Sequence, residues 1–446
     1  MEQGSLKRQL GLWTATALVV GEVIAVGIFL TPAGMAKSLG SPLWLLLVWV
    51  LMGAMALCGA LCYAELAARY PEAGGGYVYL REAYGERVAF LYGWMSFLVM
   101  DPGITAALAV GMASYLGFVV PLSTPGLKLV AIACILALAA INILGVRAGG
   151  WLMRWLTVLK LGLLLLILLW GFGLRLGDWS NFVPFAAQRA HSEPLVGALA
   201  GALIAAFFSF GGWWDLSKLA GEVKEPARNL PRAMIYGVVI VTLVYILTSA
   251  VFMYLIPVER VTSGETFAAQ AGEILFGGAG GRVFALVVVV SVLGSLAGVI
   301  MAAPRVYYAM ARDGVFLPFA AEVNTRFRTP ARAIAMQAVL ASVLAALGNF
   351  KEIVAYFVFV VVLFLALTVA AVFVLRRRQQ GKGAEAVPGY RLFGYPFTPL
   401  IFLALIAVLL IMLLGSNIRN SLLGVLVVAL GLPIYQLLYG KRKALV

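Results

Sequence analysis

The fold is decided by two stretches of sequence, VVGEVIAVGIFLTP at Val19–Pro32 and AAFFSFGGWWDLSK at Ala205–Lys218. Both lie within long apolar runs, and both carry glycines near the middle: Gly21 and Gly27 in the first, and the Gly211–Gly212 pair in the second. Glycine weakens a helix by about 1 kcal/mol relative to alanine, so each run has a place at which a helix can unwind. Glycine is also a packing residue in membrane helices, and either stretch alone fits that simpler interpretation.

The composition around these stretches requires a lipid environment. Of the 446 residues, 63% are hydrophobic and 12% are charged, whereas a soluble domain has about 45–50% apolar and about 25% charged residues. A soluble enzyme, a disordered chain and a disulfide scaffold are therefore excluded. We expect an all-α integral membrane protein, because lipid offers no partner to an unpaired backbone and a spanning helix needs about 20 apolar residues. Twelve segments qualify: about 10–32, 43–66, 88–118, 127–146, 153–174, 196–219, 232–256, 282–311, 331–348, 352–375, 398–415 and 419–438.

The distribution of basic residues predicts the orientation. The net charge is +14, and most Lys and Arg residues fall on alternate connections, which places both termini in the cytoplasm under the positive-inside rule. Membrane orientation then explains the excess of basic residues, and no nucleic-acid partner is needed to account for it. The connections are short, so we expect one multi-pass domain in the cell (cytoplasmic) membrane, with repeats at 10–174 and 196–375 followed by 398–438.

The positions of the two glycine-containing stretches indicate a transporter. They lie in segments one and six, and two five-helix repeats have opposite orientations because five is odd. Interrupted helices at matching positions of inverted repeats mark the central site of secondary transporters. Unpaired N–H groups at the positive end of a half-helix attract a carboxylate, and unpaired carbonyls accept from an ammonium group. Backbone alone could therefore hold an amino acid zwitterion.

Several motifs occur in an order that resembles the amino acid–polyamine–organocation (APC) superfamily, and within it the bacterial relatives of the L-type amino acid transporters. They are GIFLTP (27–32), YAELAARYPEAGGGYVYLREAYG (63–85), FSFGGWWDLSKLAGEVKEPARNLPRAM (208–234) and GSLAG…PRVYYAMARDG (294–314). The resemblance implies a LeuT-like fold with a 5+5 inverted repeat, discontinuous helices 1 and 6, and alternating access.

The resemblance also implies which residues bind substrate. A carboxylate cradle falls on Ala25, Val26 and Gly27, where many relatives have Gly-Ser-Gly, so the site should be drier and tighter here. The carbonyls that bind the ammonium group fall on Val23 or Ile24 in the first stretch, and on Phe208, Ser209 and Gly211 in the second, with Phe210 between them. Phe208 is also the expected outer gate.

Charges within the apolar runs each need a reason, because a charge at bilayer depth costs about 2.5 to over 10 kcal/mol. The resemblance places the ammonium of Lys160 where sodium-coupled relatives hold sodium, which implies sodium-independent transport; the alternative is an interface lysine. Glu22, Asp101 and Asp215 are candidates for proton coupling, or else for hydrogen bonds to freed backbone N–H groups.

Further charges lie at the cytoplasmic side. We expect Glu65 to be a solvated or ion-paired gate residue. Glu222, Arg228 and Arg305 either form an inner gate or are ordinary positive-inside charges with counter-ions.

The sequence thus favours a sodium-independent secondary carrier of neutral L-amino acids, working as an exchanger or a proton symporter. A cationic amino acid or polyamine carrier that uses Asp101 or Asp215 is the alternative, and a channel or receptor is a remote one. We expect no enzyme activity, cofactor or metal, since no catalytic or ATPase motif is present and His191 is the only histidine. Expected partners are the amino acid, lipid and possible coupling protons. The loop VVPLSTPGLK (119–128) lacks the cysteine that joins animal L-type carriers to a glycoprotein subunit.

Overall fold

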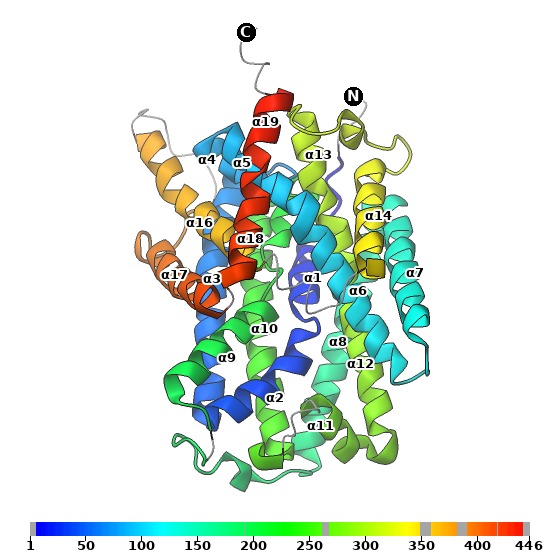
Figure 1. The fold of residues 1–446 in the computed structure, drawn as a ribbon, viewed down its shortest axis with the longest axis vertical. Helices are drawn as coiled ribbons and strands as arrows, with labels where there is room; N and C mark the ends of the chain where they lie inside the picture. The colour runs from blue at the N-terminus through cyan, green and yellow to red at the C-terminus, as the bar shows by residue number, and fades with distance from the viewer. Residues whose placement is uncertain are drawn as a thin grey trace.

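The computed structural model describes residues 6–190, 192–260, 267–347, 358–380, 390–416 and 418–439, which form an all-helical bundle (Figure 1). These residues contain no β-strand, only an isolated bridge between Leu10 and Val223. Within them, nine helices are long and apolar enough to cross a membrane, and the bent pair α1–α2 would be a tenth. The prediction of an all-α, multi-pass membrane protein is confirmed. His191 lies outside the described residues.

The helices follow the predicted apolar segments closely, because each run of apolar residues ends at a glycine, proline or charged connection. In the first part they are α1 (Leu12–Val23), α2 (Gly27–Leu39), α3 (Pro42–Arg69), α4 (Gly76–Tyr84), α5 (Glu86–Met95), α6 (Asp101–Gly117), α7 (Thr124–Ile143) and α8 (Val146–Gly173). In the second part they are α9 (Leu195–Ser209), α10 (Pro226–Leu255), α11 (Phe267–Phe276), α12 (Gly280–Ala302), α13 (Pro304–Arg312), α14 (Ala331–Leu347), α16 (Val358–Gln380), α17 (Phe397–Ser416), α18 (Ile418–Ala429) and α19 (Gly431–Tyr439).

Two predicted spans contain local irregularities. A π-helical turn at Ser96–Met100 joins α5 to α6 immediately before Pro102, whose ring nitrogen cannot donate a hydrogen bond. The predicted span 282–311 is divided into α12 and α13 at Pro304. The start of the predicted segment 352–375 lies outside the described residues.

The centre of the bundle is built around α1, which packs against α8, α10 and α12, while α2 lies against α9 (Figure 1). Side chains on the outer faces are often apolar, as with Trp151, Leu165 and Leu169 of α8, which are all exposed. Such a surface is stable against lipid chains and not against water. The polar groups described next are, in contrast, enclosed by the helices.

Candidate functional site

The first predicted span is broken between α1 and α2. α1 ends at Val23, α2 begins at Gly27, and their axes differ by 45°. Gly27 lies so close to the end of α9 that a Cβ atom on it would be 2.7 Å from the Cα atom of Ser209. Because that neighbour is backbone, it cannot move as a side chain would. Gly27 therefore permits the close approach of the two segments.

The second break follows α9. This helix ends at Ser209, and the chain resumes at Asp215 as a short 3-10 helix, η3 (Asp215–Glu222). Between them Gly212 has a φ of +107°, a conformation that glycine adopts without steric cost. The structure thus has an interruption at each of the two glycine-containing stretches.

The two breaks leave backbone groups of opposite polarity unpaired. The amides of Val26, Gly27 and Ile28 donate to no acceptor among the described residues, and they lie at the N-terminal, positive end of α2. The carbonyl oxygens of Phe210 and Gly211 accept no hydrogen bond within the same described part, and they follow the C-terminal, negative end of α9. One junction therefore offers donors for an anion and acceptors for a cation.

A cavity of about 100 Å³ lies at this junction. Seven of the residues predicted to bind substrate line it, namely Val23, Ala25, Val26, Gly27, Phe208, Ser209 and Gly211. Its other walls are mostly apolar: Ile104, Ala107 and Leu108 from α6, Val299 from α12, Val358 and Val361 from α16, with Phe207 and Trp214. Glu22, Gly212 and Asp215 complete the lining.

Two of the predicted binding residues, Ile24 and Phe210, do not line the cavity. The carbonyl of Ile24 instead accepts from Lys160. The ring of Phe210 packs against Trp49 and Tyr245, with centroid distances of 6.1 and 5.1 Å. The physical reason is that one residue in each break must face the neighbouring helices to hold the broken ends in place.

Tyr245 of α10 joins the two breaks and was not anticipated from the sequence. Its hydroxyl oxygen lies 2.8 Å from the carbonyl oxygen of Val23 and 2.7 Å from that of Ser209, so its one proton is shared between the ends of α1 and α9. The Phe208 carbonyl accepts from the N–H of Gly211. Among the predicted carbonyl acceptors, the Gly211 carbonyl is thus the one left without a donor in the described part of the chain.

Lys160 of α8 reaches the first break from the opposite side. Its fully buried ammonium group donates to the carbonyls of Gly21, Ile24 and Ser291 at 2.8, 2.6 and 2.7 Å. The hydroxyl of Ser295 lies 3.5 Å away and donates to Gly21. An ammonium has three donors and no acceptor, so these carbonyls satisfy it. Its burial does not fit the alternative of an interface lysine.

Asp101, Lys218 and Asp215 form a buried charge cluster beside the cavity. The Lys218 ammonium donates to Asp101 at 2.8 Å and lies 2.9 Å from Asp215. The second carboxylate oxygen of Asp101 accepts from Ser96 and Tyr307 at 2.7 and 3.2 Å. Sequence reasoning named both aspartates but missed Lys218, although its spacing of three residues from Asp215 was a usable signal.

Proton coupling and hydrogen bonds to freed backbone N–H groups are the two interpretations of the three carboxylates, and within the described residues none of the three accepts from a backbone N–H group. Asp101 is held by side chains, Asp215 pairs with Lys218, and both carboxyl oxygens of Glu22 lack a hydrogen-bond partner in the described part of the chain. The reason is tertiary: Lys218, on η3, folds back between the two aspartates and supplies the positive charge that they need.

Comparison with known proteins decides the family. Residues 10–432 match the family described as amino acid permease. The chain belongs to the amino acid permease family. Its members are transporters rather than enzymes, and the resemblance to the APC superfamily is confirmed.

Relatives of this permease cover most or nearly all of the chain. The serine/threonine exchanger SteT of Bacillus subtilis (strain 168) is 34% identical over 447 residues, covering 99% of this chain and 98% of that protein. The human large neutral amino acids transporter small subunit 2 is 30% identical over 445 residues, covering 98% and 82%. The human b(0,+)-type amino acid transporter 1 is 31% identical over 376 residues, covering 83% and 77%.

The predicted gate residues of the permease form two separate groups. Arg305 of α13 donates to Glu222 at 2.7 and 3.2 Å, and both side chains are fully buried. Arg228 does not join them, because it is exposed and lies 3.6 Å from Glu225. Glu65 is buried rather than solvated: it pairs with Arg376 and Arg69 and accepts from the Leu392 N–H.

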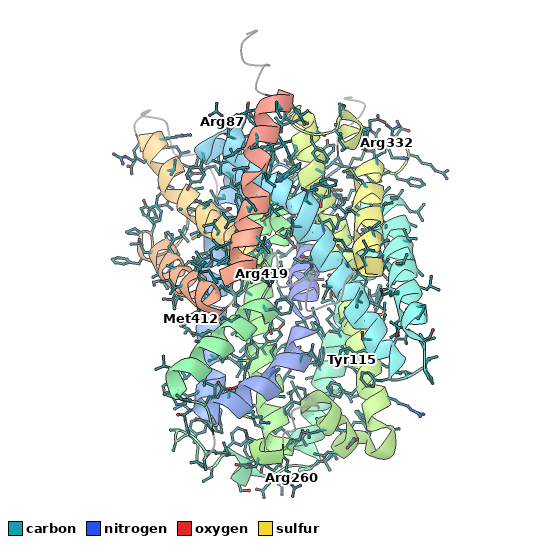
Figure 2. All side chains as sticks on the ribbon, in the orientation of Figure 1. Arg87, Tyr115, Arg260, Arg332, Met412 and Arg419 are labelled. Atoms are coloured by element: carbon teal, nitrogen blue, oxygen red, sulfur yellow. The ribbon has the colours of Figure 1, made fainter. Side chains whose placement is uncertain are left out.

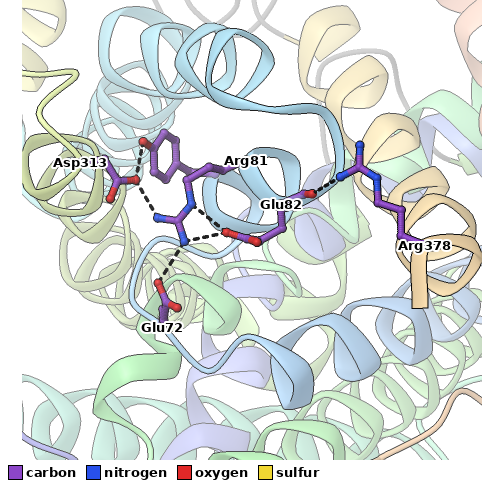
Figure 3. Close-up of polar contacts among 6 residues, drawn as sticks. Glu72, Arg81, Glu82, Asp313 and Arg378 are labelled. Carbon is purple, nitrogen blue, oxygen red and sulfur yellow. Dashed lines mark hydrogen bonds and ion pairs between the residues drawn. The ribbon is translucent and has the colours of Figure 1, made fainter. Parts of the chain in front are cut away.

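A third polar network, which the sequence did not predict, surrounds Arg81 of α4 (Figure 3). Its guanidinium contacts Asp313 at 2.7 Å, Glu82 at 3.0 Å and Glu72 at 3.2 Å. Asp313 also accepts from Tyr77 at 2.8 Å. Partial burial lowers the pKa of Arg81, but Asp313, with Glu82 and Glu72, outweighs that effect and raises the pKa above its ordinary value. The network joins α4 to the end of α13, and the Glu82 carbonyl accepts from Arg378 of α16.

Proposed function

We propose that this permease is a sodium-independent exchanger of neutral L-amino acids that works by alternating access. The observation that carries the proposal is the meeting of the N-terminal end of α2 and the C-terminal end of α9 on one small cavity. A zwitterion presents the carboxylate and the ammonium that these two ends attract. Support for exchange comes from SteT, whose name describes an exchanger, and support for neutral substrates comes from the large neutral amino acids transporter.

Lys160 supports independence from sodium. Its ammonium is surrounded by carbonyl and hydroxyl oxygens, the ligands that a small hard cation also prefers, and it joins α1, α8 and α12. Because this positive charge is part of the chain, no sodium ion has to bind at the same place during transport.

For the membrane arrangement we propose twelve spans. The nine long helices, the α1–α2 pair and the shorter apolar helices α9 and α14 would supply them, in one domain with repeats at 10–174 and 196–375 followed by 398–438. The α19 helix and the segment leading into α1 lie at one end of the bundle (Figure 1). Arg87 and Arg332 lie at that end and Arg260 at the other (Figure 2). The positive-inside rule then favours a cytoplasmic position for both termini, in the cell membrane.

The cytoplasmic side of the site would be closed in this conformation. Glu222–Arg305 and the cluster of Asp101, Lys218 and Asp215 are buried there, whereas Phe208, Gly211 and Gly212 are partly exposed. These ion pairs would have to separate when the site opens inward. The ion pairs of Arg81 and Glu65 would join the helix ends at the same cytoplasmic side, farther from the cavity.

The alternative of a cationic substrate is less well supported. It requires Asp101 or Asp215 to be free to pair with the cargo, and both already pair with Lys218. We further propose that the carrier works without a disulfide-linked glycoprotein subunit.

Counterflow in proteoliposomes tests the function. Purified protein is reconstituted, the vesicles are loaded with unlabelled L-alanine or left empty, and uptake of labelled L-alanine is measured. We expect uptake only into loaded vesicles, at the same rate with sodium or choline outside and with or without a pH gradient. Uptake that requires sodium would contradict the role of Lys160, and uptake into empty vesicles driven by a pH gradient would show proton symport instead of exchange.

A further inference from the structure

One polar side chain on the cavity wall has no partner. Glu22 is 5% exposed, it lines the cavity, and neither of its carboxyl oxygens makes a hydrogen bond within the described residues. Burying a carboxyl without a donor is costly, so a purely structural role gives no reason for it.

The structure makes room for this carboxyl from two other segments. A Cβ atom on Gly298 of α12 would lie 2.5 Å from Glu22 Cγ and 2.6 Å from Oε1. A Cβ atom on Gly212 would lie 3.3 Å from Glu22 Cβ. Two glycines thus form a pocket for the side chain, which holds the carboxyl at the cavity.

The nearby cations are engaged elsewhere. Asp215, Lys218, Asp101 and Lys160 are the charged groups that act most strongly on Glu22. Lys218 is shared by the two aspartates, and Lys160 is satisfied by three carbonyls. Glu22 must therefore find its hydrogen-bond partner in whatever occupies the cavity.

From its position, Glu22 should contact the side chain of the bound amino acid and not its carboxylate or ammonium group. The carboxylate end of a zwitterion is drawn to the amides at Val26–Ile28, and the ammonium end to the carbonyls that follow α9. Glu22 is the last residue but one of α1, directly before the break, and it faces Gly298, next to the apolar lining residue Val299. Apart from Glu22 and Asp215, the side chains that line the cavity carry no charge.

We propose that Glu22 is a specificity-determining residue that hydrogen-bonds the hydroxyl of a short substrate side chain. A hydroxyl both donates and accepts, so it pairs with a carboxyl in either protonation state. A site that satisfies a buried polar group through the substrate rejects an analogue of equal size that lacks the hydroxyl. Threonine and valine are such a pair. The inference rests on the proposed transport of amino acids.

The test measures the concentrations of L-threonine and L-valine that halve the exchange of labelled L-alanine. For the unmodified protein we expect threonine to be about tenfold or more the better competitor, the effect of one buried hydrogen bond. Glu22→Met keeps the length of the side chain but cannot form the bond, and should reduce the ratio to near one. Glu22→Gln can donate and accept, and should keep most of it. Glu273→Met, an exposed position on α11, is the control and should leave the ratio unchanged.

Each outcome bears on the inference. A threonine-to-valine ratio near one in the unmodified protein overturns it without any variant. An unchanged ratio in Glu22→Met also overturns it, and so does a loss in Glu22→Gln as complete as in Glu22→Met, which would show that Glu22 acts through its charge. If Glu22→Met is too unstable for transport, thermal shifts of the unmodified and Glu22→Gln proteins with the two amino acids give the same comparison. Failure to exchange any amino acid would instead refute the proposed function.

Discussion

Replacing Gly27 by alanine tests whether the contact between the two broken helices positions the binding groups. The new Cβ atom would lie 2.7 Å from the Cα atom of Ser209, whereas carbon atoms in contact are about 3.5–4.0 Å apart. The start of α2 and the end of α9 must therefore separate by roughly 1 Å. This would move the free amides at 26–28 away from the carbonyls of the second break.

The expected result is a large loss of exchange with a moderate loss of stability. A misplacement of about 1 Å costs up to about 100-fold in activity, so we expect counterflow of L-alanine to fall at least tenfold. Inserting one methyl group into a packed site costs typically 1–3 kcal/mol of unfolding free energy, so the variant should still fold. Counterflow in proteoliposomes and thermal unfolding in detergent measure the two quantities.

The same helix supplies the matched control. Gly34 is also in α2, and a Cβ atom there would meet nothing within 4 Å. Gly34→Ala should therefore exchange normally and be as stable as the unmodified protein or slightly more stable. Normal exchange by Gly27→Ala, or equal losses in the two variants, would refute the reasoning.

Three further changes test other parts of the site. Lys160→Met removes the cation that joins α1, α8 and α12, and should reduce counterflow about tenfold or more; unchanged exchange would remove the lysine from the mechanism. Tyr245→Phe removes only the hydroxyl shared by the ends of α1 and α9. We expect the free energy of unfolding to fall by about 1 kcal/mol and exchange to become severalfold slower. An unchanged unfolding temperature would contradict this. Arg305→Met leaves Glu222 buried without a cation and should cost about 3–5 kcal/mol in denaturant unfolding, whereas adding Glu222→Leu should restore part of the loss; additive losses would argue against the pair.

Much of the binding site could be predicted because it is made of backbone. A break in a helix exposes the same N–H and carbonyl groups whatever the side chains are, and glycines in an apolar run mark the place. Seven of the nine predicted positions accordingly line the cavity. Ile24 and Phe210 are exceptions, since the direction in which each residue of a break points depends on the helices around it.

The sequence by itself determined that this chain is a helical membrane protein interrupted in its first and sixth apolar segments. Length, hydropathy and glycine placement are local properties, and lipid allows few structures that satisfy them. Only the tertiary structure decided which charges pair: Lys218 with Asp101 and Asp215, Lys160 with three carbonyls, and Glu22 with no group among the described residues. Those partners are distant along the chain, and an ion pair within a membrane depends on distances of a few ångströms that no local pattern specifies.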